Sequence, residues 1–257
     1  MTVEVRPASS LDLERLAGLF NEAYSDYFVP ISLDPPTLVL ISELWDIDLD
    51  ASRVAGEEAF ALLGVRGDRG WIGGMGVVPA ARRRGHGEAV MRRVIEEARA
   101  RGLREVSLEV LVQNEPARRL YEKLGFEFVR ELEIWELGAV AGGDAQEISL
   151  DEALAEIRSR RTSHEPWQRA DATVDHLRSH DPPPIGLAVD GGAAIVRLSG
   201  DHSSILQLAA DDPRPLLAAV TPLIWLNVPA EDPASRALSE LGARVSEHQL
   251  ELVLPLD

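Results

Sequence analysis

The chain has 257 residues, which is enough for one or two domains without stabilising disulfides. Its composition, with 45% hydrophobic and 27% charged residues, is typical of a globular protein. Its 43 acidic and 26 basic residues give a net charge of −17, which excludes diffuse nucleic-acid binding because the summed field repels phosphates. The absence of cysteine excludes disulfides, a thiolate nucleophile and a cysteine zinc site. No signal-peptide pattern and no membrane-length apolar run is visible, so we expect a cytoplasmic protein that binds no membrane.

The first half predicts alternating strands and helices of an α/β layered domain. Ser10 would cap the first helix. The strands Ala59–Arg66 and Trp71–Val78 would form a hairpin around the turn Gly67–Gly70. The expected elements are a strand at Val3–Arg6, helices at Ser10–Tyr24 and near Thr37–Leu44, strands at Ala59–Arg66 and Trp71–Val78, a helix at Glu88–Arg101, a strand at Leu103–Gln113, a helix at Glu115–Leu124 and a strand at Phe126–Leu137.

A second unit is predicted after a small, Gly-rich linker at Ala139–Ala145. Pro116–Gly125 and Pro233–Gly242 match at a constant spacing of 117 residues, and both follow an apolar strand and precede another. A constant spacing across strand, helix and glycine favours an internal duplication. Coincidence is the alternative, since Leu-Gly after a helix is also ordinary C-cap chemistry.

One loop combines glycines with arginines between a strand and a helix: Arg82, Arg83, Arg84, Gly85, His86 and Gly87. At such a place backbone N–H groups and the helix dipole converge, which suits a phosphate or pyrophosphate. The Walker pattern and the dinucleotide pattern G-x-G-x-x-G are both absent. A helix start with solvated arginines is the alternative interpretation.

Two motifs together resemble the GNAT superfamily of acyl-CoA-dependent N-acyltransferases. The family's pyrophosphate loop, Arg/Gln-x-x-Gly-x-Gly/Ala, corresponds to Arg82–Gly87 and follows the strand end Val77-Val78-Pro79. Its second signature corresponds to Leu108, Glu109, Asn114, Ala117, Tyr121, Gly125 and Phe126. The resemblance covers residues 3–137 and implies a mixed, mainly antiparallel twisted sheet flanked by helices. With the repeat, we expect two GNAT-like domains: a catalytic one at 1–138, the linker at 139–145, and a degenerate one at 146–257.

The resemblance also implies roles for individual residues. Acetyl-CoA would be the co-substrate, with its pyrophosphate held by the loop and its pantetheine by strand main chain and the second motif; the implied cofactor-binding residues are Val77, Val78, Arg82, Arg83, Arg84, Gly85, His86, Gly87, Glu88, Asn114 and Ala117. Tyr121 would protonate the departing thiolate, a role that suits a neutral phenol. Asn114 as a helix N-cap and Tyr121 as a packed aromatic are the alternatives.

The general base and the acceptor site are less constrained by the motifs. Glu109 is the candidate base, with a spacing similar to that of the ribosomal-protein alanine acetyltransferases; a solvated strand carboxylate or a water chain are the alternatives. Tyr24, Tyr27 and Phe28 fall where the family's amine-binding loops lie, although core packing also explains them. A small-molecule amine or a peptide N-terminus is the expected acceptor.

The second half lacks the chemistry of the first. At the 117-residue spacing Leu238 replaces Tyr121 and Glu231 replaces Asn114, and Asp211-Asp212-Pro213 stands where a phosphate loop would be. His176 and His180 are four residues apart without the glutamate of a zincin, so we expect no metal. The predicted function is N-acetyl transfer to a primary amine in a ternary complex. The alternatives are a non-catalytic acyl-CoA-binding regulator or a protein N-terminal acetyltransferase.

Overall fold

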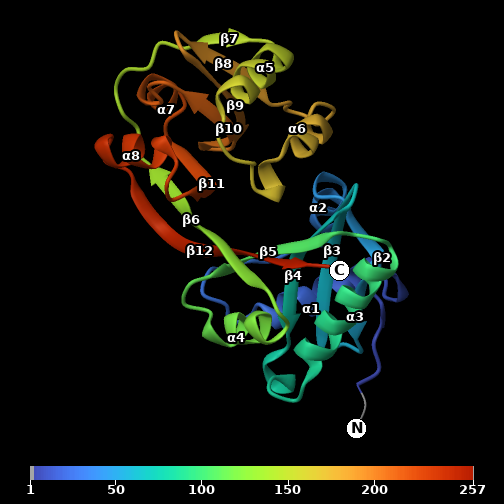
Figure 1. Cartoon of the computed structure of the whole chain (residues 1–257). Coiled ribbons are helices and arrows are strands. Elements are labelled where there is room, and N and C mark those ends of the chain that lie inside the picture. The colour runs from blue at the N-terminus through green and yellow to red at the C-terminus, as the bar shows by residue number, and fades with distance from the viewer. Residues whose placement is uncertain (1–2, 257) are drawn as a thin grey trace. The chain divides into compact units, whose positions relative to one another are not determined.

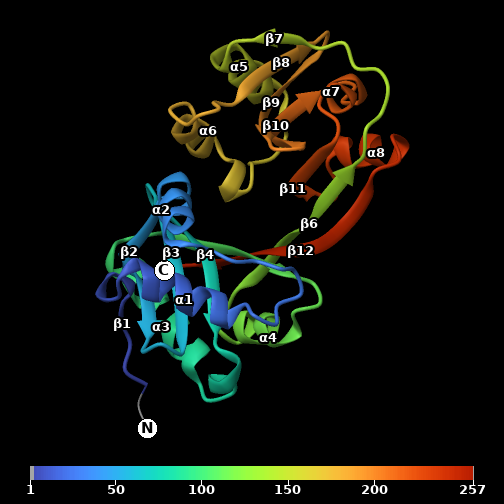
Figure 2. The same cartoon turned by 180° about the vertical axis from the view of Figure 1, so that it is seen from behind.

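A computed structural model describes residues 3–256, except for the side chain of Ser199. The chain forms two compact units, which Figures 1 and 2 show from opposite sides. Unit 1 contains the described residues up to Val129 and those from Glu251 onward, and unit 2 contains Arg130–Leu250. No helix within the described range has both the length and the apolar character needed to cross a bilayer.

The boundary between the units differs from the predicted one at residues 138–146. It falls inside β6 (Glu127–Leu137), because Leu132–Leu137 of this strand pair antiparallel with β11 (Leu223–Pro229) of unit 2. The segment 139–145 contains no helix or strand, but it packs within unit 2 instead of connecting two domains. A Cβ atom at Gly143 would lie 2.3 Å from the backbone nitrogen of Ala219.

Unit 1 contains the helices and strands predicted up to residue 124, with corrections at its N-terminus and at residues 47–55. Its elements are β1 (Arg6–Pro7), η1 (Ala8–Ser10), α1 (Leu13–Ala23), α2 (Pro35–Leu44), β2 (Ile47–Ala55), β3 (Ala59–Arg66), β4 (Arg69–Val77), η2 (Pro79–Ala81), α3 (His86–Ala100), β5 (Glu105–Leu111) and α4 (Glu115–Lys123).

Two of these corrections have local causes. Asp12, not Ser10, caps α1, because its carboxylate accepts the Arg15 N–H at 2.8 Å while the Ser10 hydroxyl donates to the Pro7 carbonyl. Strand β2 was not predicted because the Asp48 carboxylate accepts the backbone N–H groups of Asp50 and Ala51, and this kink breaks the alternation and shifts the register with β3.

The sheet of unit 1 runs in the order β1-β2-β3-β4-β5, followed by the last residues of β12 (Arg244–Pro255). The first four strands are antiparallel and β4–β5 is parallel. A Cβ atom at Gly76 would meet Ala23 of α1, whereas one at Gly87 of α3 would meet Val77. Since neighbouring strand residues point to opposite faces, α1 and α3 cover opposite faces, as Figures 1 and 2 show.

Unit 2 repeats this order of elements, as a duplication requires. Its remaining elements are β7 (Gln146–Ile148), α5 (Leu150–Arg160), η3 (Trp167–Arg169), α6 (Asp171–Leu177), β8 (Ile185–Val189), β9 (Gly192–Ser199), β10 (His202–Ala210), α7 (Arg214–Ala219) and α8 (Pro233–Glu240). Strands β7 to β10 are antiparallel and β10–β11 is parallel, which reproduces the pattern of β1 to β5. The mixed, mainly antiparallel sheets flanked by helices confirm the predicted fold class.

Candidate active site

Strands β4 and β5 of unit 1 separate after a short parallel pairing. Their register joins Arg69–Trp71 to Glu105–Ser107, while β4 continues to Val77 and β5 to Leu111. Gly73 is a bulge residue, because the register with β3 passes from Leu63–Ile72 to Leu62–Gly74. The bulge and the separation turn main-chain groups of β4 away from regular pairing, so this end of the sheet can pair with an extended ligand.

The glycine-arginine loop connects β4 to α3 in an unusual backbone conformation. Arg83 and Gly85 have φ angles of 60° and 88°, and Gly85 forms the N-cap of α3 without a side-chain cap. The first intrahelical bond runs from the Ala89 N–H to the Gly85 carbonyl, so the N–H groups of the first turn have no carbonyl within the helix. His86 is buried, and its Nδ1 atom has no hydrogen-bond partner. This geometry fits an anion at the start of α3.

Ion pairs hold the loop from two sides. Arg82 binds Asp26 through both terminal nitrogens and also donates to the carbonyl of Ala23. Glu58, in the β2–β3 turn, lies 3.4 Å from Arg84 and 3.3 Å from the His86 Nε2 atom. The Arg82 charge is therefore paired within the protein.

Arg83 and Glu88, the remaining charged residues of the loop and the helix start, differ in their contacts. Arg83 is exposed and forms no ion pair within the described residues. Glu88 pairs with Lys123 of α4 and with Arg92, and these hydrogen bonds, that of Lys123 first, lower the pKa of the Glu88 carboxyl. Arg83 is thus the loop cation available to an anion, and the Glu88 side chain ties α3 to α4.

The predicted pantetheine contacts are partly occupied by protein atoms. The Val77 carbonyl accepts Arg82 Nε at 3.1 Å, and the Val78 N–H donates to the Glu58 carbonyl at 2.9 Å. Asn114 is the N-cap of α4, and its side-chain oxygen accepts the Ala117 N–H at 3.4 Å. The capping interpretation of Asn114 is therefore confirmed, while its amide NH₂ donors take no part in the cap.

All three tyrosines of the chain lie together in unit 1. Tyr24 and Tyr27 have ring centroids 4.8 Å apart, and Phe28, which is 52% exposed, lies 5.4 Å from Tyr27. Burial raises the pKa of the Tyr121 phenol above its ordinary value, and the nearby Tyr24 and Tyr27 raise that pKa further. The predicted acid is thus close enough to two of the predicted acceptor residues to interact electrostatically with them, and its raised pKa keeps it protonated.

The predicted base has a partner that the sequence did not reveal. The Trp71 indole Nε1–H donates to the Glu109 carboxylate at 2.8 Å, and Glu109 is half-buried. Trp71, Asp26 and Glu58 were all missed as site residues, because each acts through a partner far away in the chain. For Trp71 the only sequence signal is that β4 and β5 are neighbouring strands.

Residues 15–126 match the sequence profile described as the acetyltransferase (GNAT) family. Residues 15–126 are a GNAT domain. Membership of this family implies acyl transfer from an acyl-CoA, and the open strand pair and the loop at α3 fit such a ligand. No curated protein is similar enough in sequence to count as a match.

Solved structures share the fold of the whole chain. A GCN5-related N-acetyltransferase from Sphaerobacter thermophilus is 15% identical with a TM-score of 0.73, over 98% of this chain and 95% of the other. A tandem GNAT protein from the clavulanic acid biosynthesis pathway is 15% identical with a TM-score of 0.64, over 99% and 98%. A GCN5-related N-acetyltransferase from Kribbella flavida is 16% identical with a TM-score of 0.62, over 99% and 72%.

In unit 2 the strands that correspond to β4 and β5 of the GNAT domain also separate. Strands β10 and β11 pair in parallel only through Ser203–Ser204 and Leu223–Ile224. The buried Arg169 lies between them: it donates to the Leu206 carbonyl of β10 at 3.2 Å and to the Asn227 carbonyl of β11 at 2.9 Å. The Arg169 guanidinium thus forms hydrogen bonds with main-chain carbonyls of both β10 and β11.

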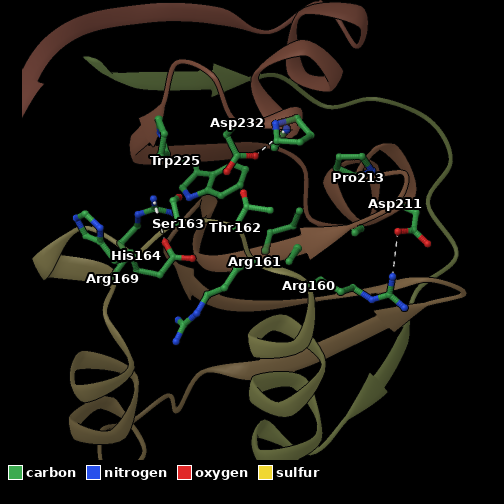
Figure 3. Close-up of a pocket in the computed structure, with 17 residues that line it drawn as sticks. Arg160, Arg161, Thr162, Ser163, His164, Arg169, Asp211, Pro213, Trp225 and Asp232 are labelled. Atoms are coloured by element: carbon green, nitrogen blue, oxygen red, sulfur yellow. Dashed lines mark hydrogen bonds and ion pairs between the residues drawn. The ribbon is translucent and has the colours of Figure 1, made fainter. Parts of the chain in front are cut away.

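A cavity of about 110 Å³ lies beside Arg169, lined by residues of α5, β10, β11 and α8 and of the loop after α5. Figure 3 shows Arg169 and Trp225 on one side of this pocket, and Asp211 and Pro213 on the other. The Arg169 guanidinium lies 5.3 Å from the centre of the Trp225 ring and 3.2 Å from the Glu165 carboxylate. Within the described residues, no group of three or more His, Asp or Glu side chains could hold a metal ion.

Proposed function

We propose that the GNAT domain transfers an acetyl group from acetyl-CoA to a primary amine by direct attack while both substrates are bound. The observation that supports this best is the buried, protonated Tyr121 phenol, which interacts electrostatically with Tyr24 and Tyr27, the aromatic residues proposed to line the acceptor site. The chain has no cysteine for a covalent thioester relay, and its net charge of −17 suits a cationic amine.

The residues divide the chemistry as follows. Bound acetyl-CoA would supply a thioester, which is an activated acyl group. The N–H groups at the start of α3 and the exposed Arg83 would hold the pyrophosphate. Glu109 accepts the proton that the amine must lose before it attacks, and Tyr121 donates its phenolic proton to the thiolate sulfur.

The second unit serves a structural role in this proposal, so that one chain binds one acyl-CoA. Arg169 already binds carbonyls on both separated strands. The Asp212 carboxylate accepts the Arg214 N–H at the start of α7, where a phosphate would require a positive field. Titration calorimetry with acetyl-CoA should therefore give one equivalent per chain, and two equivalents would contradict this role.

Release of the CoA thiol tests the catalytic proposal directly. Acetyl-CoA would be mixed with the protein and, in turn, with n-hexylamine, phenethylamine, spermidine and trialanine. Amine-dependent thiol release with acetylated product supports transfer, and preference for trialanine would favour a peptide N-terminus as acceptor. Acetyl-CoA binding without thiol release from any amine would favour a non-catalytic acyl-CoA-binding module.

A further inference from the structure

Trp71 lies where β4 and β5 begin to separate. It is the last β4 residue in the parallel register, opposite Ser107. Glu109 is two residues further along β5 and therefore projects from the same face as Ser107. The Trp71 Nε1–H spans the start of the opening and donates to Glu109 Oε2 at 2.8 Å. The hydrogen bond thus joins the two strands at the point where their backbone pairing ends.

The indole ring has little freedom to move. Trp71 is only 2% exposed and packs edge-to-face on Trp45, with ring centroids 5.7 Å apart. The ring also covers the bulge residue, since a Cβ atom at Gly73 would lie 2.5 Å from Trp71 Cζ3. A donor fixed in this way determines where the carboxylate that accepts from it can lie.

We propose that Trp71 is a positioning residue, which holds the Glu109 carboxylate in place where the two strands begin to separate; this rests on the proposed role of Glu109 as the base. An indole N–H can only donate, so it bonds best to the ionised carboxylate, which is the form a base needs.

Spectroscopy tests the contact without any acceptor. The chain has five tryptophans, so the spectrum of ¹⁵N-labelled protein should contain few indole N–H signals, and the Trp71 signal is the one that Trp71→Phe removes. We expect this signal to move when the carboxylate is protonated in a pH titration of the wild type, and Glu109→Gln to abolish that movement. A Trp71 signal with the same pH dependence in both proteins overturns the proposal, even where Trp71→Phe folds poorly.

Kinetics test the consequence with acetyl-CoA and the panel amine that is acetylated fastest. Trp71→Phe should lower kcat roughly tenfold while KM for acetyl-CoA changes less than about twofold, because a misplaced base slows the chemical step. In the Glu109→Gln background the same replacement should have little further effect, since Trp71 acts through the carboxylate.

Trp135 provides a matched control, because its indole Nε1 donates to the Glu133 carboxylate at 2.9 Å in unit 2. Trp135→Phe should leave kcat unchanged, and an equal loss from it would show a general effect of removing a buried indole. Equal losses from Trp71→Phe with and without Glu109 would overturn the positioning role alone. An unchanged kcat in Glu109→Gln would overturn the base assignment, and the positioning role with it.

Discussion

Arg82 forms two hydrogen bonds with the Asp26 carboxylate, at 2.7 and 2.6 Å, across 56 residues of sequence. The hydrogen bond from Arg82 is the main cause that lowers the pKa of the Asp26 carboxyl. Because Arg82 also donates to the carbonyls of Ala23 and Val77, it ties the glycine-arginine loop to the end of α1 and to β4. These contacts hold the loop in shape.

The Arg82–Asp26 pair predicts that either partner can be removed with the same result. Arg82→Gln and Asp26→Asn should each weaken acetyl-CoA binding by roughly three- to tenfold, because both loosen the same loop. Calorimetry measures the affinity, and Arg83→Gln serves as the comparison for a direct charge effect. A loss in Arg82→Gln without a loss in Asp26→Asn would show that Arg82 contacts the phosphate itself.

Local sequence patterns were sufficient to predict most helices and strands and the glycine-arginine loop. The apolar positions of α3 (Val90, Met91, Val94, Ile95 and Ala98) are all buried, as their helical spacing predicts. Gly85 adopts the left-handed conformation that favours glycine over other residues. Helices and glycine turns depend on residues within a few positions of one another, so a single sequence contains the information.

Contacts between distant residues could not be predicted in the same way. The bond from Trp71 to Glu109 depends on which strands are neighbours and on the bulge at Gly73. The compact units divide inside β6, and not at residues 138–146, because β6 pairs with β11, a pairing that the order of elements in the first half does not reveal. Several strand pairings are compatible with the same alternation of apolar and polar residues, and packing of the folded chain determines which pairing forms.

Replacing Gly85 should affect both the stability of the protein and its affinity for acetyl-CoA, and these two effects can be separated. Gly85→Ala places a Cβ in a left-handed residue with open space around it, so backbone strain should cost about 1–2 kcal/mol. Gly102→Ala is the matched control, since Gly102 also has a positive φ of 75° and open surroundings but follows the far end of α3. Both variants should show similar losses in Tm, and only Gly85→Ala should weaken acetyl-CoA binding. Equal affinities in the two variants would contradict the role of the loop.

The proposed role of Tyr121 as the acid predicts a lower kcat in Tyr121→Phe and a particular pH dependence of the wild-type kcat. Tyr121→Phe should lower kcat by about 10² or more while acetyl-CoA affinity stays nearly constant, because only proton donation is removed. Burial raises the pKa of the phenol, so Tyr121 remains protonated as the pH increases from about 7 to 9, below its ordinary pKa near 10. The wild-type kcat should therefore not decrease over this range. Unchanged turnover in Tyr121→Phe would rule out the acid assignment.

Arg169 predicts a pH-dependent loss of stability in unit 2. Arg169→Met leaves Glu165 buried without its closest cation, and breaking such a pair costs about 3–5 kcal/mol when the carboxyl is charged. Burial already raises the pKa of Glu165, which Arg169 opposes, so the variant should raise that pKa further. A carboxyl with a raised pKa in the folded state is neutral at low pH, and its cost in stability grows as the pH increases from the ordinary carboxyl pKa towards the raised one.

The Tm difference between the wild type and Arg169→Met should consequently be larger at pH 8 than at pH 5. Arg160→Gln is the control, because Arg160 lines the same pocket but pairs with Glu156 and Asp211 nearer the solvent, and its Tm should stay close to that of the wild type. The Arg169→Met difference could also be independent of pH. In that case the loss would come from the carbonyls of Leu206 and Asn227, and the uncompensated Glu165 would not be its cause.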